Sequence, residues 1–189
     1  MIIIGVSGGS GSGKSTFSDL LGSKITNSIV LHVDNFMIKH LLSNKNKIID
    51  ELVVCDDGSY WLNNVYDNQD DVLNWINILV PFINNDIEKF IKNCDTDVLI
   101  IDGFLLPFLG IFSDCDYSFF IDGDLDIKLS RLVNRLKFEK RLSLFTIDVL
   151  INRVKYTSFS SYQYTYRIIH NGELDDFDYY INEIADKLN

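Results

Sequence analysis

Short apolar runs punctuate the chain and predict its strands. They are Met1–Val6, Ile29–Val33, Val98–Ile101, Tyr117–Ile121 and Tyr166–Ile169. A continuous run of this length, without alternation of apolar and polar residues, is typical of a strand that is buried on both faces of a sheet. We therefore predict a sheet that is covered by other elements on both sides.

Between these runs, apolar residues recur every three or four positions, as they do in amphipathic helices. The segments with this spacing are Val72–Phe90, Leu125–Leu136 and Phe177–Leu188, and a further helix should begin near Ser15. Pro81 and Asn84–Asn85 leave open whether the first of these segments forms one helix or two.

The order of strands and helices predicts the fold class. Buried strands that alternate with helices are joined by right-handed crossovers and form a mostly parallel sheet with helices on both faces. We predict a three-layer α/β fold with five mostly parallel strands, formed by one domain over residues 1–189. Asp57–Gly58, between two short apolar segments, is a hairpin signal. It predicts a small insertion at about 35–95 that shapes a substrate site.

Composition and charge exclude several classes of protein. The formal net charge of −10 opposes binding to a nucleic-acid backbone. No apolar run is long enough to span a membrane, and no basic segment precedes an apolar one near Met1 as in a signal peptide. The cysteines and histidines lack the spacing of metal sites. We expect a cytoplasmic protein without membrane or nucleic-acid partners.

A glycine-rich stretch after the first apolar run satisfies the pattern G-x-x-x-x-G-K-[ST]. The stretch comprises Gly8, Gly9, Ser10, Gly11, Ser12, Gly13, Lys14 and Ser15, with Thr16 next. Glycines let successive backbone N–H groups point inward as an anion nest, and the following helix adds the positive end of its dipole. Lys14 can bridge the β- and γ-phosphates of a nucleotide, and the Ser15 hydroxyl can bind Mg²⁺. The stretch predicts a phosphate-binding loop for Mg-ATP.

The phosphate loop alone does not specify the reaction, since GTPases, ATPases and kinases share it. A GTPase would carry an N-K-x-D motif, whereas Asn46–Asp50 has one residue too many before the acid. A short chain with its loop close to Met1 favours a small-molecule kinase.

Two aspartates directly follow predicted strands. Asp34 should lie at the carboxyl edge of the sheet, where it could accept the proton of a substrate hydroxyl or cap a helix. Asp102 ends an apolar run in the manner of a Walker-B carboxylate that holds Mg²⁺. Ser15, Asp34 and Asp102 are the candidate metal ligands. Asp122 also ends a strand, and for it a capping role is the better interpretation.

Two arginines share one face of the predicted helix Leu125–Lys140. Arg131 and Arg135 are four residues apart, opposite the leucine stripe, and Lys128 lies on the same side. Such a face is either solvated or able to close over phosphates. With a phosphate loop present, we favour a lid at about 125–145 that neutralises charge on the transferred group.

The ordered motifs resemble the uridine kinase and phosphoribulokinase-like branch of P-loop kinases, which includes nicotinamide riboside kinases. The matching segments are Ile4–Thr16, Asp34–Phe36, Tyr66–Asp70, Ile101–Gly103, Ile127–Arg141 and Ile168–Gly172. Together they span most of the chain, although only the phosphate loop is highly specific. Asp102 stands where the family usually has Glu, and Gln69 replaces the proline of the substrate motif.

The resemblance implies a role for each matching residue. Asp34 would be the general base on a ribose 5′-hydroxyl, and Asp102 would serve Mg²⁺. Arg131 and Arg135 would contact phosphates from the lid. Tyr66 and Asp67 would contact the nucleoside. Phe36 and Tyr60 are candidates for stacking on a flat base, although aromatic residues in this number more often belong to a core.

We therefore predict an ATP-dependent kinase acting on a small-molecule hydroxyl, with Asp34, Lys14, Arg131 and Arg135 as catalytic residues. The expected acceptor is the 5′-hydroxyl of a ribonucleoside such as uridine or cytidine. The alternatives are a nicotinamide riboside kinase, a pantothenate or sugar kinase on the same scaffold, and a regulatory module that binds nucleotide without catalysis. The sequence leaves the oligomeric state open.

Overall fold

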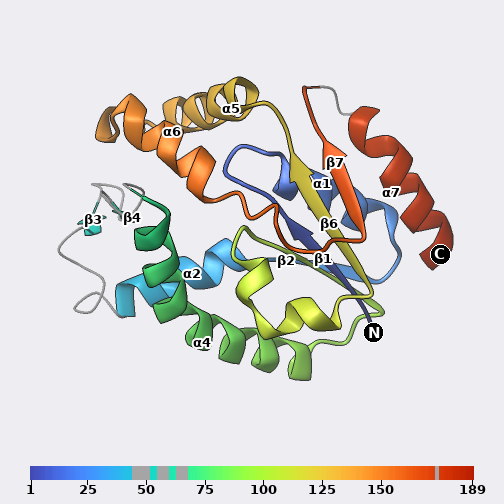
Figure 1. Ribbon diagram of the computed structural model, residues 1–189. Helices are drawn as coiled ribbons and strands as arrows, with labels where there is room; N and C mark the ends of the chain where they lie inside the picture. The colour runs from blue at the N-terminus through green and yellow to red at the C-terminus, as the bar shows by residue number, and fades with distance from the viewer. Residues whose placement is uncertain (44–51, 55–59, 63–67, 173–174) are drawn as a thin grey trace.

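The apolar runs form one parallel sheet, as the sequence predicts (Figure 1). The strands are β1 (Ile2–Ser7), β2 (Ser28–His32), β5 (Val98–Asp102), β6 (Tyr117–Asp122) and β7 (Tyr166–Ile169), in the order β2-β5-β1-β6-β7. Every pairing within this sheet is parallel. This computed structural model describes residues 1–43, 52–54, 60–62, 68–172 and 175–189.

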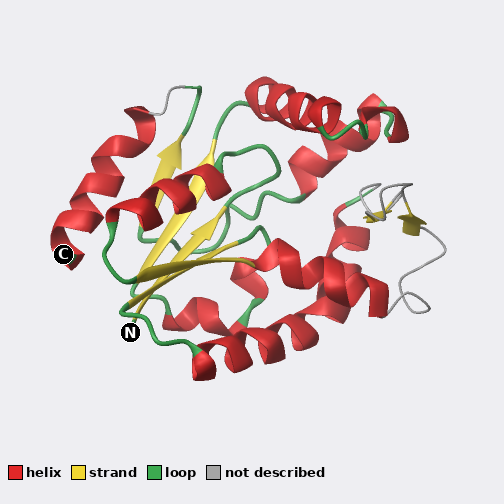
Figure 2. Cartoon of the chain, turned by 180° about the vertical axis from the view of Figure 1, so that it is seen from behind, coloured by secondary structure: helices red, strands yellow, loops and turns green. Residues whose placement is uncertain are grey.

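Helices cover both faces of the sheet (Figure 2). They are α1 (Lys14–Lys24), α2 (Val33–Ser43), α4 (Gln69–Asn93), α5 (Leu125–Phe138), α6 (Ile147–Tyr156) and α7 (Asp175–Leu188). Short 3-10 turns are η1 (Leu106–Phe108), η2 (Gly110–Asp114) and η3 (Leu142–Leu144). Within the described ranges, no helix is long and apolar enough to cross a membrane.

Strand β5, which lies between β2 and β1, shows why the apolar runs do not alternate. Leu99 and Ile101 pack with α4 in one core cluster, and Ile100 packs with α1 and α7 in another. Both faces of the strand are therefore dry, and every position selects an apolar side chain until Asp102 at the carboxyl end.

Helix α4 resolves the question that Pro81 raised, because it is one continuous helix from Gln69 to Asn93. Its buried face continues past Pro81, with buried residues on both sides of it from Val72 to Ile87. Pro81 itself is exposed. Packing of the stripe on the sheet outweighs the lost backbone hydrogen bond at the proline.

The predicted hairpin is present as two short antiparallel strands, β3 (Leu52–Val54) and β4 (Tyr60–Leu62). It forms a separate two-stranded sheet. The intervening residues 55–59 lie outside the described residues.

Helices α5 and α6 lie beyond the arrowheads of the sheet (Figure 1). The leucine stripe of α5 continues the core, since buried Leu132 and Leu136 pack against Leu150 and Val154 of α6. This places both helices at the carboxyl edge of the strands, next to the phosphate loop.

Candidate phosphate-binding and phosphoryl-transfer site

The glycine-rich loop connects β1 to α1, in the strand-to-helix context that the sequence predicts. The first intrahelical bond of α1 runs from the N–H of Phe17 to the carbonyl of Gly13. The N–H groups of Lys14, Ser15 and Thr16 therefore have no partner within the helix and are free for an anion. The side chain of Lys14 is largely buried beside them.

Gly11 shows how tightly the loop is packed against α5. Its φ angle of +79° lies in the left-handed region. A Cβ atom at this position would collide with the carbonyl oxygen of Lys128. Only glycine satisfies both the backbone conformation and the close approach of the helix.

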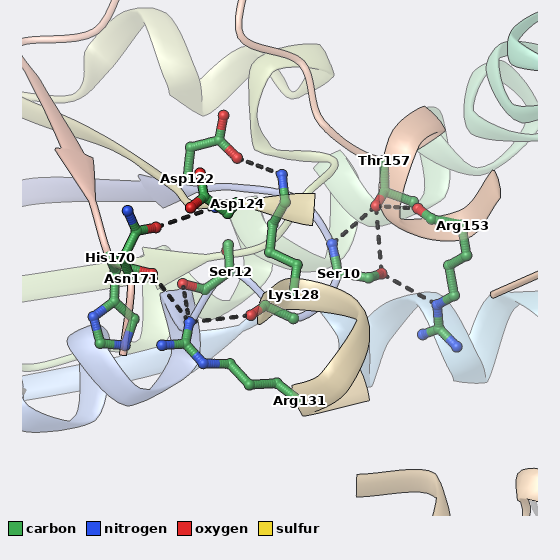
Figure 3. A network of polar contacts seen from close by, with 11 residues as sticks. Ser10, Ser12, Asp122, Asp124, Lys128, Arg131, Arg153, Thr157, His170 and Asn171 are labelled. Atoms are coloured by element: carbon green, nitrogen blue, oxygen red, sulfur yellow. Dashed lines mark hydrogen bonds and ion pairs between the residues drawn. The ribbon is translucent and has the colours of Figure 1, made fainter. Parts of the chain in front are cut away.

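Arg131 reaches from α5 to the loop and to the end of β7 (Figure 3). Its Nη1 donates to the carbonyl of His170 at 3.3 Å and to the carbonyls of Gly11 and Ser12 at 3.5 Å each. Burial lowers the pKa of Arg131, while Asp176 acts in the opposite direction. Arg131 thus ties together segments that are far apart in the sequence.

Residues at the end of α6 contact the loop at Ser10 (Figure 3). The N–H of Ser10 donates to Thr157 Oγ1 at 2.9 Å, and the Thr157 hydroxyl donates to the carbonyl of Arg153 at 2.7 Å. Arg153 Nε donates to Ser10 Oγ at 3.1 Å, which closes a ring of hydrogen bonds. Arg153 and Thr157 were not predicted from the sequence. The spacing of Leu150 and Val154 after Thr146, whose side chain caps α6, was the available signal.

A cavity of about 260 Å³ opens between the loop and α5. It is lined by Gly11, Gly13, Lys14, Ser15, Thr16, Arg131, Leu132 and Arg135. Five of the predicted loop residues and both predicted arginines therefore line one cavity. The Arg135 side chain is half exposed and lies 3.8 Å from Glu139, so it is less constrained than Arg131.

Contrary to the prediction from the sequence, Lys128 does not lie with Arg131 and Arg135 on an open cationic face. It is buried, and its Nζ lies 2.5 Å from Asp122 Oδ1. This ion pair also gives Asp122 a structural role at the end of β6, in place of the capping role that we expected.

Asp102 lies at the centre of the carboxyl edge and is only 2% exposed. Its Oδ1 is 2.6 Å from Nδ1 of His32, the residue opposite it in β2. Burial raises the pKa of Asp102, whereas the Ser15 hydroxyl and the charges of Lys14 and His32 lower it. The buried Oδ2 of Asp102 has no hydrogen-bond partner among the described residues.

Asp34 lies in the first turn of α2, which follows β2 without a loop. The preceding residue, Val33, packs so closely on the strand end after Asp102 that a Cβ at Gly103 would be 2.9 Å from Val33 Cβ. Asp34 is therefore held at the same edge as Asp102. Its Oδ1 is buried and, within the described part of the chain, unpaired.

The residues around Asp102 fit a Mg²⁺ ion that is shared with a nucleotide. The unpaired Oδ2 of Asp102 and the nearby Ser15 hydroxyl are the oxygen donors that Mg²⁺ prefers. Among the described residues, no group of three or more His, Cys, Asp or Glu side chains could hold a metal ion. Phosphate oxygens would therefore have to complete the coordination, as Mg²⁺ sites of this type require.

The predicted acceptor-side residues are less fully placed. Phe36 packs against the core and lines a second cavity of about 490 Å³ between α2 and α4, rather than the cavity at the phosphate loop. Tyr60 belongs to β4, where it pairs with Val54. Tyr66 and Asp67 lie outside the described residues.

Comparison with solved structures identifies the class of fold. TT1252 from Thermus thermophilus matches with a TM-score of 0.67 and 17% identity, over 100% of this chain and 98% of that one. A provisionally assigned kinase from Chloroflexus aurantiacus matches with a TM-score of 0.57 and 12% identity, over 100% and 98%. Shikimate kinase from Bacteroides thetaiotaomicron matches with a TM-score of 0.53 and 13% identity, over 99% and 98%.

The chain therefore has the three-layer α/β fold of P-loop kinases, as the sequence predicts. No protein-family model matches the sequence, and no curated protein matches it either. At identities of 12–17%, the likenesses to solved structures show the fold alone.

Proposed function

We propose that this protein is an ATP-dependent kinase that transfers the γ-phosphoryl group to a hydroxyl of a small molecule, namely the 5′-hydroxyl of a ribonucleoside. The observation that carries the proposal is the buried Oδ1 of Asp34, which has no partner among the described residues and lies at the edge of the sheet that also holds the phosphate loop. An unpaired carboxylate oxygen is unfavourable unless a ligand supplies the missing donor. A substrate hydroxyl is such a donor.

The donor side of the reaction uses the cavity between the loop and α5. The free N–H groups at the start of α1 and the Lys14 ammonium would bind the β- and γ-phosphates. Arg135 would neutralise charge that develops on the transferred group. Ser15 and Asp102 would hold Mg²⁺, which supplies charge neutralisation on the phosphate oxygens when it is bound.

The transfer step is an in-line displacement. The acceptor oxygen forms a bond to the γ-phosphorus as the bond from that phosphorus to the bridging oxygen of ADP breaks. The proton of the acceptor hydroxyl passes to Asp34, which orients the oxygen as it attacks. Helices α5 and α6 cover the carboxyl edge and would keep water from accepting the phosphoryl group.

The choice of a ribonucleoside rests on the resemblance of Asp34–Phe36 and Tyr66–Asp70 to uridine kinase-like enzymes. Tyr66 and Asp67 are the proposed nucleoside contacts, with Tyr60 and Phe36 as candidate stacking partners. The acceptor is thus the part of the proposal that most needs an experiment.

A coupled assay of ADP release tests the proposal against a panel of acceptors. The panel comprises uridine, cytidine, purine nucleosides, nicotinamide riboside, pantothenate, sugars and shikimate. We expect turnover with a pyrimidine nucleoside, and a loss of about 100-fold or more in Asp34→Asn, since general-base catalysis contributes ~10²–10⁴-fold. Bound ATP without turnover on any acceptor would instead support a regulatory nucleotide-binding module.

A matched pair of lysine variants tests the donor site separately. Lys14→Ala should lose triphosphate binding and turnover, because Lys14 lines the cavity at the start of α1. Lys24→Ala, in the last turn of the same helix, should behave as the unaltered protein. Full turnover in Lys14→Ala would contradict the proposed role of the loop.

A further inference from the structure

His32 contacts the proposed metal carboxylate but has no part in the reaction as described above. It is the last residue of β2 and lies opposite Asp102 in the parallel pairing of β2 with β5. Its Nδ1 is 2.6 Å from Asp102 Oδ1. Nothing in the sequence pattern predicts this contact, because it depends on the register of strands that are 70 residues apart.

The contact leaves the two oxygens of Asp102 in different situations. Oδ1 accepts from the imidazole, while Oδ2 is buried and has no partner among the described residues. A carboxylate that is held at one oxygen cannot rotate freely, so the direction of the other oxygen is fixed. Because Asp102 is only 2% exposed, water is a poor substitute for the imidazole donor.

The imidazole is itself held in place. Its Nε2 lies 3.4 Å from Asp19 Oδ1 on α1, so both ring nitrogens face a carboxylate. The backbone of His32 is fixed by the pairing of β2 with β5. Asp19 lies on the helix whose first turn carries Lys14 and Ser15. His32 therefore links the strand that carries Asp102 to the helix that would bind the phosphates.

We propose that His32 is a positioning residue that orients Asp102, so that its Oδ2 and the Ser15 hydroxyl hold Mg²⁺ at the bound phosphates. This inference rests on the proposed function, because it requires a magnesium nucleotide at the loop. Carboxylates that bind metals are commonly oriented by a hydrogen bond from a neighbouring side chain. Asp is one methylene shorter than Glu, so its reach to the metal depends more strongly on its orientation.

The test is a titration of nucleotide binding with Mg²⁺, measured by calorimetry with a non-hydrolysable ATP analogue. The protein is compared with His32→Ala, His32→Asn and His40→Gln. We expect His32→Ala to weaken the apparent Mg²⁺ affinity by about 10- to 100-fold, the range for loss of a partner of a metal ligand. Binding of the analogue in EDTA should change by less than about twofold, since the phosphate loop is intact.

The other two variants separate positioning from a general effect on folding. The Asn amide nitrogen can take the place of Nδ1, so His32→Asn should recover most of the Mg²⁺ affinity. His40→Gln is the matched control, because His40 also pairs with an aspartate, Asp86, at 2.9 Å but lies in the last turn of α2, whereas His32 directly precedes the first turn. It should bind Mg²⁺ and nucleotide normally.

Two results would overturn the inference while leaving the proposed function intact. One is unchanged Mg²⁺ dependence in His32→Ala. The other is an equal loss of binding with Mg²⁺ and in EDTA, which indicates a purely structural role. If His32→Ala does not fold, His32→Asn and His32→Gln give the same test, because only Asn places its amide at the Nδ1 position. Absence of Mg²⁺-dependent binding in the unaltered protein would instead overturn the proposed function.

Discussion

Thr157 Oγ1 accepts the backbone N–H of Ser10 at 2.9 Å, across 147 residues of sequence. Both residues are buried, so the hydroxyl of Thr157 takes the place of a solvent molecule at the loop. Arg131 holds the carbonyls of Gly11 and Ser12 from the other helix of the lid region. The phosphate loop is therefore shaped by α5 and α6 together, and not by its glycines alone.

Replacing Thr157 by Val should leave the N–H of Ser10 buried without an acceptor. A group of this kind destabilises a protein by about 1–3 kcal/mol, so thermal unfolding should shift to lower temperature. Nucleotide binding should weaken as well, because the loop loses its fixed shape. Thr157→Ser keeps the hydroxyl and is the control, which we expect to retain both properties within error. Equal behaviour of the two variants would contradict the role of the hydroxyl.

Replacing Gly11 by Ala should be far more harmful than replacing Gly172. Both glycines have positive φ angles, +79° and +137°. A side chain there strains the backbone by about 1–3 kcal/mol. Gly11 is also crowded by the carbonyl of Lys128, whereas a Cβ at Gly172 would meet no atom of the described residues within 4 Å. We expect Gly11→Ala to lose nucleotide binding and unfold well below Gly172→Ala in a denaturant titration.

Replacing Arg135 should affect catalysis without affecting stability, whereas replacing Arg131 should affect stability and nucleotide binding. Arg135 is half exposed and its contact with Glu139 is 3.8 Å long, so Arg135→Ala should leave thermal stability unchanged. It should nevertheless lower kcat by about 100-fold, the typical loss for one group that stabilises transition-state charge. Arg131→Ala should lower both stability and nucleotide affinity, because three backbone carbonyls lose their donor. A stable, fully active Arg135→Ala would remove this residue from the mechanism.

Replacing Asp102 should raise the stability of the protein and lower its activity. Burial raises its pKa above the ordinary value of 3.8, so the folded state resists ionisation of this carboxyl. This destabilisation is absent below pH 3.8 and grows as the pH rises through the folded pKa. Asp102→Asn should therefore raise the free energy of unfolding at neutral pH by about 0.5–2 kcal/mol without ligand.

The same variant should lose Mg²⁺-dependent activity, since the amide is a poor ligand for Mg²⁺ beside phosphates. Urea unfolding of both proteins between pH 3.5 and 7.5 measures the difference in stability. A difference that shrinks as the pH rises would contradict the sign of the pKa shift at Asp102.

The strands and the loop were predictable from the sequence because each depends on local chemistry. The run from Val98 to Ile101 marks a strand that is covered on both faces, and the glycines before Lys14 mark an anion nest. The structure confirms the strand and the loop that leads into α1, and binding of an anion by the loop stays a prediction. The order of these elements was sufficient for the three-layer architecture, because right-handed parallel connections leave few alternatives.

The contacts made across the sheet were not predictable in the same way. The sequence predicted Lys128 as part of a cationic face, but its side chain pairs with Asp122 at the end of β6. In the sequence His32 is an ordinary residue near the end of a predicted strand. Its contact with Asp102 follows from the register between β2 and β5. Pro81 left open whether its segment forms one helix or two, and tertiary packing keeps α4 as one helix. Such outcomes depend on three-dimensional packing rather than on local propensity.

The hydrogen bonds that Thr157 and Arg131 make with the phosphate loop also bear on the stage of translation at which the protein can bind nucleotide. The loop leaves the ribosome before either helix, since Thr157 and Arg131 are synthesised 147 and more than 100 residues after their partners in it. Nascent chains that end before α6 should therefore carry the whole glycine motif and still fail to retain nucleotide. Competence to bind is acquired late in translation, as a property of long-range closure.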